Sequence, residues 1–127
     1  MDERDRHSKG MEIRRAVLGD AHVDRALART TAFNEEFQDL ITRYAWGEIW
    51  TRPGLDLKTR TLVCVVTDAA TGRFPELAIH VRMALRQGWT EEQITETLLH
   101  MSGYVGVPII REGLLTAKEV FAEMKKG

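Results

Sequence analysis

The segment FPELAIHVRMAL, residues 74–85, is the stretch from which the fold of this chain can be predicted. Pro75 can begin a helix, because the first helical position needs no backbone N–H, and Gly88 can end it in the left-handed conformation. Between them, five apolar residues repeat at helical spacing: Leu77, Ala78, Val81, Ala84 and Leu85. The pattern predicts an amphipathic helix with one face toward a core.

His80 lies along the edge of this apolar stripe, three residues after Leu77 and four before Ala84. Arg82 lies on the opposite edge, roughly 160° around the helix from His80 at about 100° per residue. A titratable ring held against apolar surface is a suitable acid or base. The alternative is a histidine that only completes a core or an interface.

Composition limits the class of protein. A chain of 127 residues fits one domain, and 43% hydrophobic with 29% charged residues is typical of a globular protein. Eighteen basic and nineteen acidic residues give a net charge of −1, which argues against a nucleic-acid partner. Cys64 is the only cysteine, so a disulfide or a two-cysteine redox site within one chain is excluded. We expect Cys64 to be a small core residue.

No apolar run approaches the ~20 residues that span a bilayer, and the polar start MDERDRHSKG does not resemble a signal peptide. We therefore expect a cytoplasmic protein with no membrane partner. Residues 1–10 are highly charged, and we expect a frayed N-terminus there. Residues 11–127 are expected to form a single helical domain.

The rest of the chain shows the helical period, and no segment alternates convincingly with period two. Helix ends are predicted at several positions: a stop at Gly19, caps at Asn34 and Asp56, a capping box of Thr90 with Gln93, and a break at Gly106 and Pro108. Helical patterns cover residues 11–18, 21–28, 35–44, 57–71, 91–105 and 110–126. The fold class is all-α, a compact multi-helix bundle.

No Gly-rich phosphate loop, zinc-protease motif or serine-hydrolase motif is present, and the four histidines show no metal-ligand spacing. We expect neither metal nor cofactor. Chemistry would then depend on side chains alone. Candidate acids and bases are His22, His80, His100 and Glu48, candidate anion-binding groups are Arg43, Arg60, Arg82 and Arg111, and candidate pocket walls are Trp46, Trp50 and Tyr104. Each also has a purely structural reading, as a surface charge or a core side chain.

Four blocks carry a family resemblance: GDAHVDRA (19–26), DLITRYAWGEIWTRPGLDLKTRTL (39–62), ELAIHVRMALRQGWTEEQITETLLH (76–100) and YVGVP (104–108). Together they closely resemble the carboxymuconolactone decarboxylase family, with similarity from about Met11 to Phe121. The resemblance implies a helical protomer of the alkylhydroperoxidase D-like type. It also implies a ring-forming homo-oligomer, a trimer or hexamer.

The wider superfamily includes thiol peroxidases with a glutamate, a C-x-x-C pair and a histidine. When His80 is placed on the family histidine, Arg73 and Glu76 stand where the two cysteines would be. Thr61 stands near the position of the glutamate. Thiol peroxidase chemistry is therefore not expected.

The resemblance implies decarboxylation, without a cofactor, of 4-carboxymuconolactone to 3-oxoadipate enol-lactone, in the protocatechuate branch of the β-ketoadipate pathway. The expected partner is thus a small dicarboxylate lactone. We assign proton delivery to His80, with Glu48 orienting it or relaying the proton. The remaining assignments are a carboxylate clamp from Arg43, Arg60 or Arg82, a pocket wall from Trp46 and Trp50, and a hydrogen bond to the lactone from Tyr104.

Two alternatives remain at this point. The chain can be a paralogue that acts on another carboxylated lactone or acid. It can also be a non-catalytic helical oligomer, or the partner subunit of a lactonase. A catalyst would hold His80 and an arginine in an enclosed apolar pocket, whereas a scaffold would leave them solvated or paired.

Overall fold

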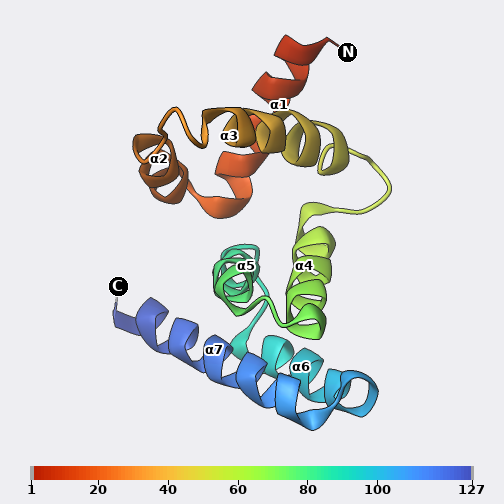
Figure 1. Cartoon of the computed structure of the whole chain (residues 1–127). Coiled ribbons are helices and arrows are strands. Elements are labelled where there is room, and N and C mark those ends of the chain that lie inside the picture. Colours follow the sequence, from red (N-terminus) through yellow and green to blue (C-terminus); the bar gives the residue numbers. More distant parts are fainter. Residues whose placement is uncertain (1, 127) are drawn as a thin grey trace. The chain divides into compact units, whose positions relative to one another are not determined.

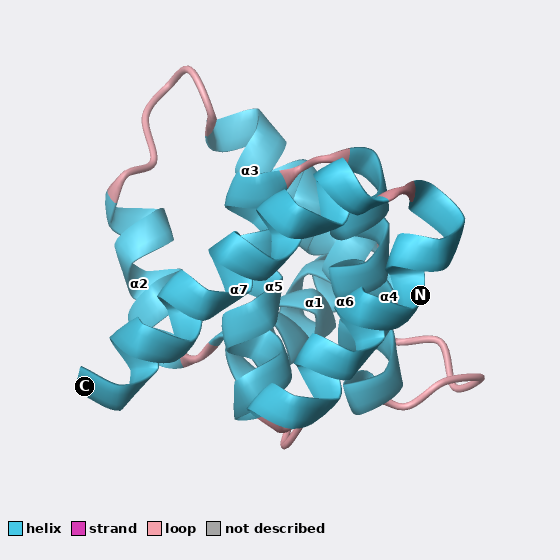
Figure 2. Ribbon diagram, turned by 90° about the horizontal axis from the view of Figure 1, so that it is seen from below, coloured by secondary structure: helices cyan, strands magenta, loops and turns pink. Residues whose placement is uncertain are grey.

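The computed structural model describes residues 2–126 and contains seven α-helices and one π-helix (Figure 1). No strand occurs in this described range (Figure 2), which confirms the all-α prediction. The contacts divide the chain into two compact units, Met1–Asp56 and Leu57–Gly127, where the sequence predicts one domain over 11–127. None of the helices formed by residues 2–126 is long and apolar enough to cross a membrane.

Unit 1, Met1–Asp56, contains four helical segments. They are α1 (Glu3–Leu18), α2 (Asp20–Ala28), α3 (Glu35–Ile41) and the π-helix η1 (Thr42–Ile49). Helix α3 continues directly into η1, where the Trp50 N–H donates to the Ala45 carbonyl across five residues at 3.0 Å. The apolar spacing of the sequence predicted a helix here, but it cannot distinguish a π-helix from an α-helix.

Two glycines allow α1 and η1 to pack backbone against backbone. A Cβ at Gly10 would lie 2.0 Å from the Thr42 carbonyl oxygen, and a Cβ at Gly47 would lie 2.3 Å from the Arg6 carbonyl oxygen. Real side chains cannot come so close to backbone atoms. Unit 1 is therefore held together at a contact that only glycine permits on both helices.

The N-terminal segment differs from the frayed tail predicted for residues 1–10. Helix α1 begins at Glu3, and the Asp2 carboxylate accepts a hydrogen bond from the Asp5 N–H at 2.9 Å. Glu3 then pairs with Arg43, forty residues later in the chain, at 2.8 Å. These charged residues are thus cap and packing contacts rather than a solvated tail, while Met1 lies outside the described residues.

Unit 2, Leu57–Gly127, contains α4 (Leu57–Thr71), α5 (Phe74–Arg86), α6 (Glu91–Val105) and α7 (Val107–Lys126). These helices share a continuous apolar core, to which the segment 74–85 contributes the fully buried Leu77, Val81 and Ala84. Val65 of α4, Leu98 of α6 and Ile110 of α7 also belong to it. Burying such side chains is worth about 1.5–3 kcal/mol each relative to exposure.

Most of the local signals in unit 2 are confirmed. Pro75 lies in the first turn of α5, and Gly88 has a φ of 98° just beyond its end. Thr90 and Gln93 form the predicted capping box of α6, with both hydrogen bonds at 3.0 Å. Gly106 separates α6 from α7, but α7 already begins at Val107, so Pro108 lies in its first turn and not in the predicted break. Pro75 and Gly88 thus bound the helix that carries His80.

The apolar stripe of α3 and η1 does not become a core. Phe37, Leu40 and Tyr44 are 62%, 50% and 60% exposed, and the preceding Phe33 is 97% exposed. Periodicity locates an apolar face but does not say what covers it. The structure therefore leaves an uncovered apolar surface on unit 1.

Candidate functional site

The candidate site in unit 2 is built on a histidine–aspartate pair. His80 of α5 contacts the Asp68 carboxylate of α4 through its Nδ1 atom. The side chain of Asp68 is 9% exposed and that of His80 is 21% exposed. The ring is therefore anchored at one nitrogen by a buried charge, while the histidine keeps a limited opening to solvent.

Asp68 is the functional residue that the sequence analysis missed. The buried residues of α4 are Thr61, Val65, Asp68 and Ala69, which follow the helical period. A carboxylate on this face is unusual, because ionised side chains are rarely buried unless they are paired. That one acidic residue in an otherwise uncharged buried face was the available signal.

Cys64 shows how the surroundings of Asp68 act on a titratable group. It lies on α4 one turn before Asp68, and burial together with the negative charge of Asp68 raises the pKa of its thiol to about 11. The thiol is therefore protonated at neutral pH, which makes it a weak nucleophile. Its partly buried position agrees with the prediction of a small packing residue.

The other predicted residues of unit 2 lie in different places. Arg82 pairs with Glu123 of α7 at 2.6 Å, so it contacts a different helix from His80, as their spacing on α5 predicts. Tyr104 is 79% exposed, and its ring lies 5.2 Å from that of His100. Arg60 is half-buried on α4. Arg82 and Tyr104 thus have their contacts with residues other than His80.

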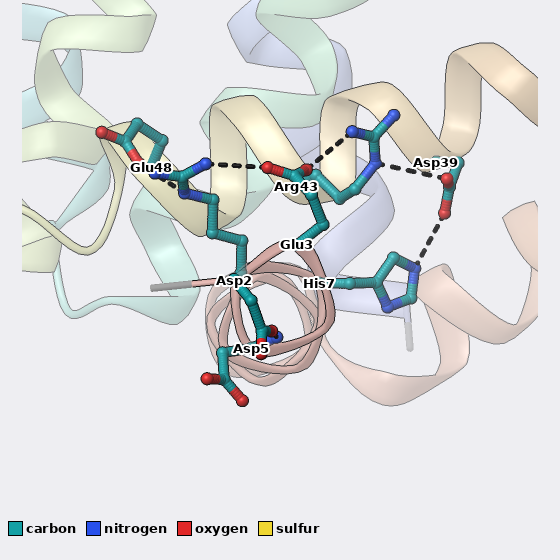
Figure 3. Close-up of polar contacts among 8 residues, drawn as sticks. Asp2, Glu3, Asp5, His7, Asp39, Arg43 and Glu48 are labelled. Carbon is teal, nitrogen blue, oxygen red and sulfur yellow. Dashed lines mark hydrogen bonds and ion pairs between the residues drawn. The ribbon is translucent and has the colours of Figure 1, made fainter.

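Arg43 and Glu48, in unit 1, belong to a chain of ion pairs along α1 and α3–η1 (Figure 3). Glu48 pairs with Arg6 at 2.9 Å, and both Arg6 and Arg43 pair with Glu3 at 2.8 Å. Arg43 also contacts Asp39 at 3.3 Å. These same four residues, Glu3, Arg6, Arg43 and Glu48, help line an open cavity of about 360 Å³.

The charges of this network act mainly on one another. The hydrogen bond to Glu3 and the nearby carboxylates raise the pKa of Arg43, and the bond from Arg43 lowers the pKa of Glu3. Arg43 is thus a charged group whose donors already face carboxylates. Trp46 is buried beside Trp50, with ring centroids 4.8 Å apart, so it packs within unit 1.

The remaining candidates have ordinary surroundings. Arg111 is 74% exposed and pairs with the neighbouring Glu112 at 3.8 Å. His22 is half-buried on α2. Within residues 2–126, no three His, Cys, Asp or Glu side chains gather in a way that could hold a metal ion. The chemistry available at His80 is proton transfer by an imidazole paired with a carboxylate.

Similarity to known proteins extends over most of the chain. Residues 35–119 match the model of the carboxymuconolactone decarboxylase family. The chain is 41% identical over 124 residues to 4-carboxymuconolactone decarboxylase from Acinetobacter baylyi, covering 98% of this chain and 92% of that protein. It is 37% identical over 116 residues to nitrosuccinic acid decarboxylase npaB from Metarhizium robertsii, covering 91% and 81%. A 48-residue Pseudomonas putida 4-carboxymuconolactone decarboxylase sequence is 60% identical to 38% of this chain, over its whole length.

Proposed function

We propose that this chain, which belongs to the carboxymuconolactone decarboxylase family, removes carbon dioxide from 4-carboxymuconolactone and releases 3-oxoadipate enol-lactone. The observation that carries the proposal is the 41% identity to a 4-carboxymuconolactone decarboxylase over 98% of the chain. The buried pair of His80 and Asp68 supports it, because the reaction needs a proton donor. The proposal includes the protocatechuate branch of the β-ketoadipate pathway and a cytoplasmic location.

The chemistry of the substrate explains why few groups are needed. When the bond to the departing carboxylate breaks, its electron pair spreads through the ring double bond into the lactone carbonyl. Protonation of the carbon next to that carbonyl then gives the enol-lactone. The substrate itself accepts the electrons, so the protein has to bind the second carboxylate, keep water away and deliver one proton.

His80 is the proposed proton donor. His80 lies on α5, a helix of the unit 2 core, and its side chain is 21% exposed. The protein therefore covers most of the ring, while a substrate can still reach the exposed part. A single positioned acid typically contributes about 10²–10⁴-fold in rate. Tyr104 stays in the proposal as an auxiliary group that orients the lactone, and Asp68, which contacts the ring, takes the orienting role that the sequence analysis gave to Glu48.

Arg60 is the best placed of the three proposed carboxylate clamps. It precedes Cys64 and Asp68 on α4 at intervals of four residues, so the three lie along one side of that helix. Eight residues correspond to about 12 Å of helix, a span that an arginine side chain and a small dicarboxylate can bridge together. Arg82 lies on the opposite edge of α5 from His80 and pairs with Glu123, and Arg43 belongs to the ion-pair network of unit 1.

Replacing each clamp candidate by lysine tests this choice. Arg60→Lys is expected to raise KM at least tenfold, because lysine cannot form two parallel hydrogen bonds with a carboxylate. Arg43→Lys and Arg82→Lys keep their ion pairs and should change KM less. A larger rise in KM for either of them would move the clamp away from α4.

A second candidate substrate is supported by the similarity to a nitrosuccinic acid decarboxylase. Loss of carbon dioxide from a carbon bearing a nitro group also leaves an electron pair that the substrate delocalises, here onto the nitro oxygens. The two reactions thus ask the same of a protein: one bound carboxylate, one departing carboxylate and one proton.

Direct assay of the purified chain tests the function. Carbon dioxide release and ultraviolet loss of the substrate are followed with 4-carboxymuconolactone, with nitrosuccinate, and with muconolactone, which lacks the departing carboxylate. Turnover of the first alone supports the proposal, and turnover of nitrosuccinate alone replaces it by the second candidate. Absence of turnover with both contradicts both and leaves the non-catalytic oligomer or lactonase partner subunit.

We also propose a homo-oligomer, a trimer or hexamer of ring type. Its support is the apolar surface that the described chain leaves uncovered, including Phe33 at 97% and Val107 at 67% exposure. Large exposed apolar patches on a protein of this size usually mark interfaces. Light scattering after gel filtration tests this, and Phe33→Ser with Phe37→Ser is expected to lower the mass. A monomeric wild type would contradict it.

A further inference from the structure

Asp68 is the one buried acidic side chain among the described residues, and it lies against an imidazole instead of an arginine or a lysine. It projects from α4, one turn after Cys64 and directly before the fully buried Ala69. An ionised carboxylate in such a place is costly unless a donor or a positive charge faces it. Among the ion pairs of residues 2–126, the pair with His80 is the one in which Asp68 takes part.

We infer that Asp68 is a positioning residue for His80: it holds the ring with the proton on Nδ1 facing the carboxylate and leaves Nε2 as the atom that exchanges a proton with the substrate. The inference rests on the proposed function for its kinetic consequences. The position of the proton on the His80 ring does not depend on that function, because it can be measured without substrate.

The assignment follows from the two nitrogens of imidazole. A neutral ring carries one N–H, and because the ionised carboxylate only accepts hydrogen bonds, the proton belongs on Nδ1. A second proton on Nε2 gives the imidazolium, whose charge the nearby carboxylate stabilises. When Nε2 gives its proton to the substrate carbanion, the ring returns to the neutral form with Nδ1–H still bonded to Asp68. No proton has to move between the nitrogens.

Burial makes this coupling stronger than a surface pair. The Asp68 side chain is 9% exposed, so solvent screens its charge weakly. Cys64, one turn earlier on α4, is affected by the same carboxylate: burial of the thiol first and the charge of Asp68 second raise its pKa to about 11.

Asp68→Asn is the central test, because it removes the charge and nearly preserves the shape. We expect kcat to fall about 100-fold or more with KM changed less than about threefold, since the lost interaction develops during proton transfer. Asp24→Asn, an exposed aspartate paired with Arg15 at 2.9 Å, is the matched control and should retain wild-type kinetics. Asp68→Glu restores the carboxylate and is expected to recover at least tenfold of the lost kcat.

Nitrogen-15 spectra of the imidazole rings provide a readout that a merely structural role would not move. The His80 signals are assigned by their loss in His80→Gln. At a pH where the ring is neutral, wild type is expected to carry the proton on Nδ1, and Asp68→Asn to show a larger share of the Nε2–H form, because an amide can donate as well as accept.

The outcomes separate the two proposals. A wild-type ring with its proton on Nε2 would overturn the positioning role, and so would an Asp68→Asn variant with unchanged kcat. If Asp68→Asn does not fold, the wild-type spectrum still decides. If wild type turns over no substrate but shows Nδ1–H, the proposed function fails while the assignment of the ring stands.

Discussion

A histidine–aspartate pair occurs in each unit, and the two pairs differ in burial. In unit 2, His80 and Asp68 have side chains that are 21% and 9% exposed. In unit 1, His7 and Asp39 lie 3.2 Å apart, and their side chains are 41% and 52% exposed. The residue types are the same, so the environment alone sets what each pair can do.

Asp39 also pairs with Arg43, through which it joins the network in Figure 3. Solvent and counter-charges thus divide the attraction among several groups, and exposed pairs of this kind contribute little to stability. Asp68 faces one ring from within a core helix. We conclude that an isolated buried carboxylate, rather than the residue pair itself, makes His80 the catalytic candidate.

Removing each ring in turn is the strongest way to break this comparison. His80→Ala is expected to lower kcat/KM about 10²–10⁴-fold, because the proton donor is lost. His7→Ala, which removes the ring of the exposed pair, should leave the rate within about twofold. Steady-state rates with 4-carboxymuconolactone check both, alongside circular dichroism to confirm folding. Equal losses in the two variants would show that burial does not distinguish the pairs.

The packing of the two units can be compared through one glycine in each. Gly10→Ala places a Cβ 2.0 Å from the Thr42 carbonyl oxygen, so backbone must move. We expect destabilisation at or above the upper end of the usual overpacking range of about 1–3 kcal/mol. Gly113→Ala meets only ordinary contacts, the closest at 3.6 Å to Leu77, and should be neutral or gain up to about 1 kcal/mol from helix propensity.

Urea unfolding followed by circular dichroism measures both changes. A small loss of stability in Gly10→Ala would mean that α1 and η1 can separate without cost, and unit 1 would then not depend on their close contact. A strongly destabilised Gly113→Ala would mean that the unit 2 core has less room at α7 than its contacts indicate.

The features that the sequence predicted correctly are local. Pro75 and Gly88 bound α5, and Thr90 with Gln93 caps α6, because these signals involve residues within one turn of each other. The family assignment was possible for a similar reason, since blocks such as 76–100 keep their order and spacing along the chain. Neither depends on how one helix rotates against another.

The features that it missed depend on contacts between distant residues. Asp68 meets His80 only because α4 presents its 61, 65, 68, 69 face to α5, and a period does not identify the neighbouring helix. Helix α1 extends back to Glu3 because of Arg43, a residue forty positions later. The helical spacing of Phe37 likewise locates an apolar face, but nothing in unit 1 covers this side chain.

Cys64 sharpens the comparison by reporting on the surroundings of the buried pair. Burial, and secondarily the charge of Asp68, raise the pKa of the thiol from 9.0 to about 11. At pH 8 the thiolate fraction in the native protein should therefore be on the order of 100-fold below that in the unfolded chain. Because the folded pKa is raised, the reactivity of the native thiol increases as pH rises toward 11. The contribution of the thiol to stability is fully present below pH 9 and is lost as pH rises from 9 to about 11.

Alkylation by iodoacetamide, read by mass spectrometry in native buffer and in urea, measures this ratio. Cys64→Ala is the blank and should keep its activity, since the thiol has no proposed role. Rapid alkylation of native protein at pH 8 would place Cys64, and with it Asp68, in a wetter environment than the structure shows.

The exposed network is expected to give the smallest effect, and Glu3→Gln tests it. Hydrogen bonds from Arg43 and then Arg6 hold the pKa of Glu3 below its usual value of 4.5. A lowered folded pKa means that the contribution to stability is present above pH 4.5 and is lost as pH falls through the folded pKa. Glu3→Gln should therefore be slightly less stable than wild type at pH 7, and the difference should disappear in acid and shrink in high salt.

Urea midpoints at pH 7 and pH 3, at low and high ionic strength, measure this difference for Glu3→Gln and for the control Glu112→Gln. Glu112 lies 3.8 Å from Arg111 in a looser surface pair, so its removal should change the midpoint less. A Glu3→Gln deficit that persisted in acid or in high salt could not come from solvated charges. Glu3 would then pack as part of unit 1, and the contrast between an exposed and a buried pair would have to be drawn inside unit 1 as well.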